Sequence, residues 1–216
     1  MKEQTRRSRR EEADVLRGYT RPVANDAQRD QSSRSLEIRA SDIRLLCLDV
    51  DGVLTDGGIS IDDAGHETKR FHVRDGAALR MWSKIGLEIA VITGRNGMAL
   101  RHRLRELGVK HVIAGSKDKG AAFESLLKDL ALVPSQAAMI GDDLPDLPIL
   151  RRCGLAIAVA DASPEVLELA HLVTAHAGGN GAVREAVERI LKDAGRWAEA
   201  VRTFDPEFGA PAGGVA

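Results

Sequence analysis

Residues 43–57 read IRLLCLDVDGVLTDG, an apolar run that passes directly into a loop carrying two aspartates, Asp49 and Asp51. A short, uninterrupted apolar run is typical of a strand buried on both faces of a parallel sheet. Carboxylates at the end of such a strand are costly to bury unless a cation or several hydrogen-bond donors satisfy them. The stretch therefore predicts a buried strand that ends at a polar, cation-binding edge.

Four further apolar runs follow along the chain, and a turn and an amphipathic stretch with helical spacing follow each of them. The runs are LEIAVIT (87–93), KHVIAG (110–115), QAAMIGD (136–142) and LAIAVA (155–160). The expected helices cover residues 76–85, 96–107, 118–130, 144–152, 163–170 and 182–192. This alternation predicts an α/β fold, a Rossmann-like parallel sheet flanked by helices. In such a sheet right-handed crossovers bring the carboxyl ends of all strands to one edge, where ligands bind.

One segment departs from the alternation and divides the chain further. Residues 57–73, GGISIDDAGHETKRFHV, contain two alternating stretches around a turn and predict a β-hairpin flap over about residues 56–73.

The expected folded domain covers residues 41–192. Residues 1–40 have few large apolar side chains and are expected to be a disordered extension. Residues 193–216 are expected to form a helix end and a flexible tail.

The composition excludes several classes of function. The 31 basic and 32 acidic residues nearly cancel, so no overall positive field favours nucleic acid. The two cysteines, Cys47 and Cys153, do not have the spacing of a metal or redox motif. The sequence contains no apolar stretch of membrane-spanning length and no apolar secretion signal. We therefore expect a cytoplasmic protein with neither a nucleic acid nor a membrane as its partner.

Polar side chains also follow three of the other predicted strands. The second run ends in Thr93-Gly94-Arg95, Lys119 begins the helix after the third, and the fourth ends in GDD (141–143) with Asp146 one turn later. Singly, each has an ordinary explanation, such as helix capping or an exposed lysine. Together they place a hydroxyl, an ammonium and several carboxylates at one sheet edge, beside helix N-termini that favour anions. Magnesium prefers carboxylate and phosphate oxygens, so the sequence predicts an anion site with its own Mg²⁺.

The segments DVDGVLTDG, TGR, Lys119 and GDD match, in order, the four motifs of the haloacid dehalogenase superfamily of phosphotransferases, which the chain resembles from about Ile43 to Ile190. The resemblance implies that Asp49 is the nucleophile, which forms an aspartyl phosphate, and that Asp51 is the general acid and base. It also implies that the Asp49 side chain, the Asp51 backbone carbonyl and Asp142 hold the magnesium ion.

The same resemblance assigns the remaining polar residues. Thr93, Gly94 and Lys119 would bind the phosphoryl group, with Lys119 also counted as catalytic. Asp143 and Asp146 would have supporting roles, Asp143 by orienting Lys119 or a metal-bound water. The intervals between the motifs have room for the hairpin, strands and helices but not for a separate cap domain. The chain is thus similar to the capless members, in which a neighbouring subunit is the expected cover of the site.

The segments DVDGVLTDG, FHVRDG, GDDLPDLP and AGGNGAVRE look like those of the 3-deoxy-D-manno-octulosonate 8-phosphate phosphatase family. This resemblance implies hydrolysis of that ester to the free sugar acid and phosphate in lipopolysaccharide precursor biosynthesis. It also implies a homotetramer in which residues 178–185 reach a neighbouring site. The substrate-binding residues that it implies are Asp51, His72, Val73, Arg74, Asp75, Gly76, Arg80, Arg95 and Arg103.

Two alternatives remain open. His72 stands where an Asn is commoner in that family, so a phosphatase for the 9-phosphate of a nine-carbon sialic or KDN-type acid is the first. The second and more distant alternative is a non-catalytic scaffold with the same fold. A scaffold would be expected to have lost one of the four central residues, Asp49, Asp51, Lys119 or Asp142, and all four are present.

Overall fold

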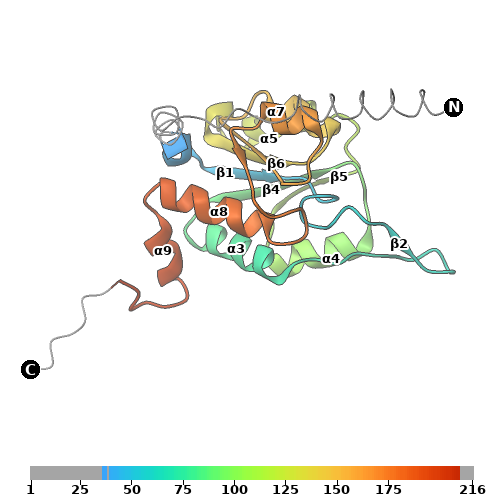
Figure 1. The fold of residues 1–216 in the computed structure, drawn as a ribbon, viewed down its shortest axis with the longest axis horizontal. Coiled ribbons are helices and arrows are strands. Elements are labelled where there is room, and N and C mark those ends of the chain that lie inside the picture. The colour runs from blue at the N-terminus through green and yellow to red at the C-terminus, as the bar shows by residue number, and fades with distance from the viewer. Residues whose placement is uncertain (1–35, 38, 210–216) are drawn as a thin grey trace, which may run out of the picture. The chain divides into compact units, whose positions relative to one another are not determined.

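The computed structural model describes residues 36, 37 and 39–209. Their centre is a six-stranded parallel sheet in the order β5-β4-β1-β6-β7-β8 (Figure 1). The strands are β1 (Leu45–Leu48), β4 (Glu88–Thr93), β5 (His111–Ala114), β6 (Ala137–Gly141), β7 (Leu155–Ala158) and β8 (Leu172–Val173). The predicted α/β fold is confirmed. Only the two-residue strand β8 was not expected, because it is too short to show a pattern in the sequence.

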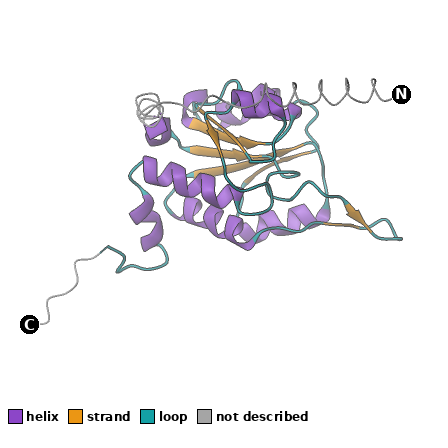
Figure 2. Ribbon diagram, viewed as in Figure 1, coloured by secondary structure: helices purple, strands orange, loops and turns teal. Residues whose placement is uncertain are grey.

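Helices cover both faces of this sheet (Figures 1 and 2). One layer contains α3 (Val73–Lys84), α4 (Met98–Leu107) and α8 (Ala182–Asp193). The other contains α5 (Lys119–Asp129), α6 (Leu147–Leu150) and α7 (Pro164–Leu169). The 3-10 helices η1 (Pro134–Gln136) and η2 (Leu144–Asp146) lie before and after β6, and α9 (Trp197–Arg202) packs against α3 and α8. The sequence interpretation did not separate α9 from the C-terminal tail.

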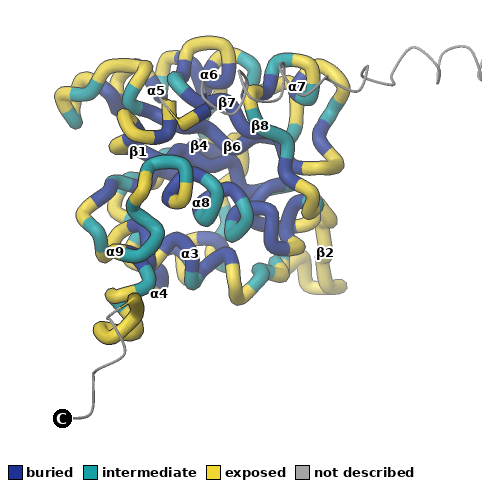
Figure 3. Tube along the Cα trace, turned by 60° about the vertical axis from the view of Figure 1, so that its left-hand side comes forward, coloured by how far each residue is buried: buried dark blue, intermediate teal, exposed yellow. Residues whose placement is uncertain are grey.

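The core lies between the two helical layers and fixes where the strands end. All four residues of β1 are 0 % exposed, and Figure 3 shows the buried strands enclosed by half-exposed helices. Leu48 at the end of β1 pairs with Val91 of β4 and Ile140 of β6. The three central strands therefore end at nearly the same level, and the loops that follow them meet at one edge.

The hairpin is shorter than the sequence suggested. Strands β2 (Ser60–Ile61) and β3 (Glu67–Thr68) pair antiparallel, while α3 begins three residues before the expected Gly76. At the tip, Oδ1 of Asp62 accepts hydrogen bonds from the backbone N–H groups of Ala64 at 3.0 Å and His66 at 2.7 Å. These bonds shape the turn, and the arm extends away from the sheet (Figure 1).

The expected disordered extension (1–40) and flexible tail lie largely outside the described residues, which omit 1–35, 38 and 210–216. Within the described part of the chain, no helix combines the length and the apolar character needed to cross a membrane.

Candidate active site

The loop that follows β1 is a tight turn that requires glycine. The backbone N–H groups of Leu54 and Thr55 both donate to the carbonyl oxygen of Val50, at 2.9 and 3.0 Å. Gly52 has a φ of +93°, a conformation that other residues rarely adopt. A Cβ at this position would lie 2.0 Å from Oδ2 of Asp142. Glycine thus allows the loop after β1 to approach the loop after β6, as the predicted site requires.

Lys119 is the buried cation at the centre of the site. It begins α5, where the side chain of Asp118 caps the helix by accepting a hydrogen bond from the N–H of Ala121 at 2.9 Å. The Nζ of Lys119 lies 2.9 Å from Oδ1 of Asp49 and 2.7 Å from Oδ1 of Asp146. An ammonium group in this place can orient the Asp49 carboxylate and stabilise negative charge on a phosphoryl group beside it.

Asp146 has the supporting role that the sequence interpretation considered for Asp143. Besides contacting Lys119, Asp146 accepts a hydrogen bond from the backbone N–H of Asp142 through Oδ2 at 3.1 Å, and its side chain is 1 % exposed. Asp143 is exposed, and the carboxylates that contact Lys119 are those of Asp49 and Asp146. The reason is the 3-10 turn η2, which directs the carboxylate of Asp146 back toward the end of β6. The orientation of Lys119 is thus assigned to Asp146.

The carboxylates at this edge fit a divalent cation. One oxygen each from Asp49, Asp142 and Asp146 lies within 4.8 Å of the other two. Both oxygens of Asp146 have partners, whereas Oδ1 of Asp142 is buried and has no hydrogen-bond partner among the described residues. Asp49 and Asp142 are therefore the side chains suited to hold the ion, and carboxylate oxygens are what Mg²⁺ prefers.

The pKa values at this edge point the same way. Burial, reinforced by the charges of Asp146 and Asp49, raises the pKa of Asp142 to about 7. Burial and Asp146 raise the pKa of Asp49 to about 6, although Lys119 acts in the opposite direction. Negative charge is thus costly here without a cation, and a divalent ion would offset that cost.

Thr93 ends β4, and Gly94 and Arg95 follow it at the same edge of the sheet. Thr93 is 1 % exposed, and its Oγ1 accepts a hydrogen bond from the N–H of Arg95 at 3.3 Å. The guanidinium of Arg95 turns toward the hairpin, where Nη2 lies 2.8 Å from Oε2 of Glu67, and Nε lies 3.7 Å from Oδ2 of Asp51. The structure therefore brings Arg95 of this strand-end triplet next to Asp51.

Asp51 contacts the hairpin through a residue that the sequence interpretation missed. Its Oδ1 forms an ion pair with Nζ of Lys69, which also lies 2.8 Å from Oε1 of Glu67. The side chain of Lys69 is only 2 % exposed. The sequence did contain a signal for this contact. In an extended segment side chains alternate between two sides, so residues 67 and 69, on either side of Thr68, share one side of the hairpin.

Two of the predicted substrate arginines lie together, apart from Arg95. Nη2 of Arg80 donates to the backbone carbonyl of Glu106 at 2.9 Å, and Nη1 of Arg103 donates to the carboxylate of Glu106 at 2.9 Å. Gly76 permits this arrangement, because a Cβ there would lie 2.3 Å from Nη2 of Arg103. The ion pairs of Arg103 and Arg95 have different partners, Glu106 and Glu67.

Asp75 connects two helices. It is 1 % exposed, and its Oδ1 accepts a hydrogen bond from the backbone N–H of Arg184 at 2.8 Å, which ties the start of α3 to α8. Burial raises the pKa of Asp75. Val73, two residues earlier, is 75 % exposed at the surface. The predicted substrate segment therefore contains both a buried connecting residue and a fully accessible one.

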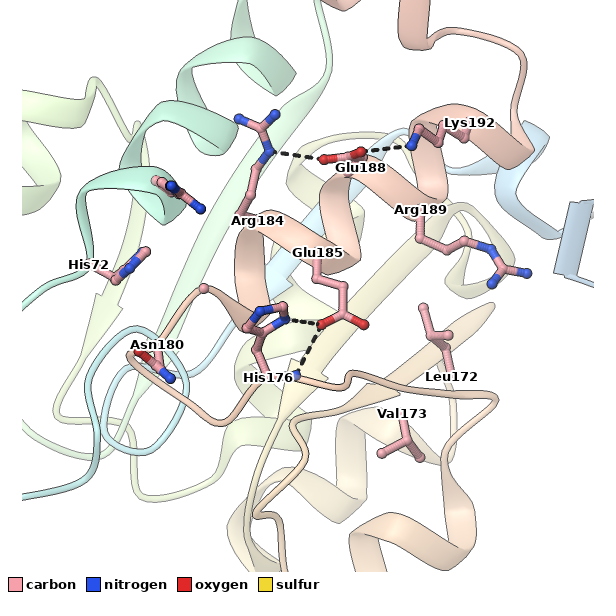
Figure 4. Close-up of a pocket in the computed structure, with 12 residues that line it drawn as sticks. His72, Leu172, Val173, His176, Asn180, Arg184, Glu185, Glu188, Arg189 and Lys192 are labelled. Carbon is pink, nitrogen blue, oxygen red and sulfur yellow. Dashed lines mark hydrogen bonds and ion pairs between the residues drawn. The ribbon is translucent and has the colours of Figure 1, made fainter.

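A cavity of about 1000 Å³ lies beside the start of α3 (Figure 4). His72 and Arg74 line it together with residues of β8, α8 and the loop between them. Nδ1 of His176 lies 2.7 Å from Oε2 of Glu185 in its wall. Of the predicted substrate residues, His72 and Arg74 are the two that line this cavity.

The glycine-rich segment before α8 packs on its own chain. The N–H of Gly179 donates to the carbonyl of Val53 at 2.9 Å, and a Cβ on Gly178 would lie 1.7 Å from the carbonyl oxygen of Gly52. The first residues of the 178–185 segment thus pack on the loop after β1 of the same chain, and the reach of this segment to a neighbouring site stays a prediction. These glycines support the nucleophile loop of the same chain, because only residues without a side chain fit so close to it.

Comparison with known proteins places the chain in a family. Residues 111–186 match the model of the haloacid dehalogenase-like hydrolases. A 3-deoxy-D-manno-octulosonate 8-phosphate phosphatase from Escherichia coli (strain B / BL21-DE3) is 44 % identical over 168 residues, 78 % of this chain and 89 % of that protein. The Yersinia pestis enzyme of the same name is 47 % identical over 153 residues, 71 % of this chain and 82 % of its own.

Solved structures of similar fold come from the same family as these sequence relatives. The phosphatase of this name from Moraxella catarrhalis, in complex with a magnesium ion, a phosphate ion and a KDO molecule, gives a TM-score of 0.77 at 40 % identity, covering 80 % of this chain and 99 % of that one. A haloacid dehalogenase superfamily (subfamily III A) hydrolase from Legionella pneumophila gives 0.81 at 40 % identity, covering 83 % and 98 %. The resemblance read from the four motifs is confirmed, and the chain belongs to the haloacid dehalogenase-like hydrolases, in the family of the 3-deoxy-D-manno-octulosonate 8-phosphate phosphatases.

Proposed function

We propose that this protein is a magnesium-dependent phosphomonoesterase that hydrolyses 3-deoxy-D-manno-octulosonate 8-phosphate to the free sugar acid and inorganic phosphate. The observation that carries the proposal is the buried contact of Lys119 with Asp49 and Asp146 beside the unpartnered oxygen of Asp142. This arrangement offers a nucleophile, a cation for the phosphoryl group and a place for a metal ion at one point. The substrate is inferred from the name of a relative that is 44 % identical.

The chemistry follows from the positions of these groups. An oxygen of Asp49 bonds to phosphorus while the bond from phosphorus to the ester oxygen breaks. The ester oxygen keeps the electron pair of that bond and takes a proton from Asp51. Water then attacks the aspartyl phosphate, gives a proton back to Asp51, and releases phosphate from Asp49. Thr93, the N–H of Gly94 and Lys119 hold the phosphoryl oxygens during both steps.

Magnesium would be held by the Asp49 side chain, the Asp51 backbone carbonyl and Asp142. When bound, it neutralises charge on the nucleophile and on the phosphoryl oxygens. Arg95, which already lies beside Asp51, is the first candidate to bind the sugar acid, followed by His72 and Arg74 at the neighbouring cavity. A bidentate guanidinium suits the carboxylate of such a substrate.

The proposed assembly is a cytoplasmic homotetramer in lipopolysaccharide precursor biosynthesis, built from the domain of residues 41–192. The exposed side chains of Ile59 (57 %) and Ile61 (62 %) on the hairpin support self-association. The described residues form no cap domain over the site, so a neighbouring subunit would exclude water from it.

The test is phosphate release in the presence of magnesium from a panel of esters. The panel contains 3-deoxy-D-manno-octulosonate 8-phosphate, the 9-phosphates of nine-carbon sialic-type acids, and simple sugar phosphates. Preference for the eight-carbon acid is expected. Preference for a nine-carbon acid would replace the named substrate, and the absence of turnover on every ester would contradict the phosphatase assignment.

A further inference from the structure

Asp51 and three other charged side chains form a closed ring in which acidic and basic residues alternate. Asp51 pairs with Lys69, Lys69 lies 2.8 Å from Glu67, Glu67 lies 2.8 Å from Arg95, and Arg95 returns to Asp51 at 3.7 Å. The ring joins three separate parts of the chain, namely the loop after β1, the hairpin and the segment after β4. Such a network fixes side-chain orientation better than an isolated surface pair does.

The members of the ring differ in their access to solvent. The side chain of Lys69 is 2 % exposed, that of Asp51 21 %, that of Glu67 25 % and that of Arg95 45 %. Lys69 is thus the desolvated member, and its ion pairs are the least screened by water. Lys69 is the partner of Oδ1 of Asp51, and without it the Asp51 carboxylate would keep, within the ring, only the longer 3.7 Å contact of Oδ2 with Arg95.

We propose that Lys69 is a positioning residue that holds the Asp51 carboxylate in the orientation needed for proton transfer to the leaving oxygen. The inference rests on the proposed function and deepens it, because it assigns to the hairpin a part in the chemical step. Proton transfer requires the carboxyl oxygen within hydrogen-bond reach of the ester oxygen, so a rotated Asp51 would fail even though it is present.

Leaving-group dependence tests this role directly. Phenyl phosphate and 4-nitrophenyl phosphate have nearly the same shape, but 4-nitrophenolate leaves readily without a proton, whereas phenolate benefits from one. We expect Lys69→Met to lower kcat/KM for phenyl phosphate by about tenfold or more, and for 4-nitrophenyl phosphate by less than about threefold. The constant kcat/KM reports the first phosphoryl transfer, in which the leaving group departs, and not the later hydrolysis.

The matched control is the neighbouring hairpin cation. Arg70 is 78 % exposed and pairs with Asp56 at 2.7 Å, outside the ring. Arg70→Met is expected to leave both constants within about twofold of the wild type, since surface ion pairs contribute little. The ratio of the two constants in one sample does not depend on the fraction of folded enzyme, so partial unfolding of Lys69→Met cannot imitate the expected result.

Equal losses on both aryl esters, or no loss on either, would overturn the proposal. If Lys69→Met does not yield folded protein, Glu67→Gln removes one anchor of the ammonium group and should shift the ratio in the same direction by a smaller factor; an unchanged ratio would again contradict it. Failure of the wild type to hydrolyse any ester would instead refute the proposed function, so the two failures are distinguishable.

Discussion

The sheet edge and the hairpin each contribute to the same site, but they are held in place differently. At the edge, Asp49 directly follows β1, and Thr93 ends the neighbouring strand β4. A fully buried core fixes the register of these two strands. The hairpin has two strands of two residues each, and it contacts Asp51 through Lys69 of the charged ring. The comparison indicates that strand register, together with the Lys119 ion pair, positions the proposed nucleophile Asp49, whereas the hairpin contacts the proposed acid Asp51 through an ion pair. Four experiments test this difference.

The largest effect is expected at the nucleophile. Asp49→Asn keeps the shape of the side chain but removes its nucleophilic oxygen, so kcat should fall by about 10⁴-fold or more. Steady-state phosphate release measures this. Asp62→Asn at the hairpin tip serves as the control for loss of one carboxylate, and a comparable loss there would show that the effect is not specific to the edge.

A smaller loss is expected for the residue behind Lys119. Asp146→Asn removes the 2.7 Å ion pair that holds the ammonium group, while the direct contact with Asp49 remains available. Removal of such an outer partner typically lowers activity by about 10- to 100-fold. A kcat within twofold of the wild type would mean that the fold alone positions Lys119.

The third experiment measures how much the negative charge of Asp142 lowers the stability of the metal-free protein. Asp142 has a pKa of about 7 against an ordinary 3.8, so the folded, metal-free protein binds an extra proton between these values. The contribution of Asp142 to the free energy of unfolding therefore decreases as the pH rises from about 4 to about 7. Asp142→Asn removes this charge and should be the more stable protein at pH 8, by about 1–2 kcal/mol after allowance for solvent screening.

Calorimetry in a chelating buffer at pH 4 and pH 8 measures this difference, which should nearly vanish at pH 4. Addition of magnesium should then raise the Tm of the wild type and not that of the variant. A variant that is less stable than the wild type at both pH values would show that Asp142 is satisfied by the protein itself.

The smallest effect on the fold is expected at an exposed apolar residue of the hairpin. Ile61 is 62 % exposed, so Ile61→Asp should change the free energy of unfolding of a single chain by no more than about 0.5 kcal/mol. If the hairpins join subunits, the same change should lower the native mass measured by light scattering. An unchanged oligomer would place the interface elsewhere.

Much of this molecule could be predicted from the sequence because its strands are uninterrupted apolar runs. The carboxyl ends of adjacent parallel strands must meet, so Asp49, Thr93 and Asp142 could be brought together without coordinates. Strand β8 was missed because two residues show no periodicity, and α9 because it has only six residues and lies close to the Gly- and Ala-rich C-terminal end.

Side-chain direction could not be predicted in the same way. The contact of Lys119 with Asp146 depends on the 3-10 turn η2, and the contact of Lys69 with Asp51 depends on how a short hairpin folds back. Arg80 and Arg103 meet at Glu106 because α3 and α4 approach closely at Gly76. These features arise from tertiary geometry, which the spacing of residues along the chain does not specify.

The packing of Gly178 and Gly179 on the nucleophile loop has a consequence for the order of synthesis. The loop after β1 leaves the ribosome early, whereas the two glycines that fit against Gly52 and Val53 leave it late. Nascent chains arrested before Gly178 would contain Asp49, Lys119 and Asp142 yet should release less phosphate than chains arrested beyond α8. Translation itself would then delay activity, since every catalytic residue is made well before the segment that completes their support.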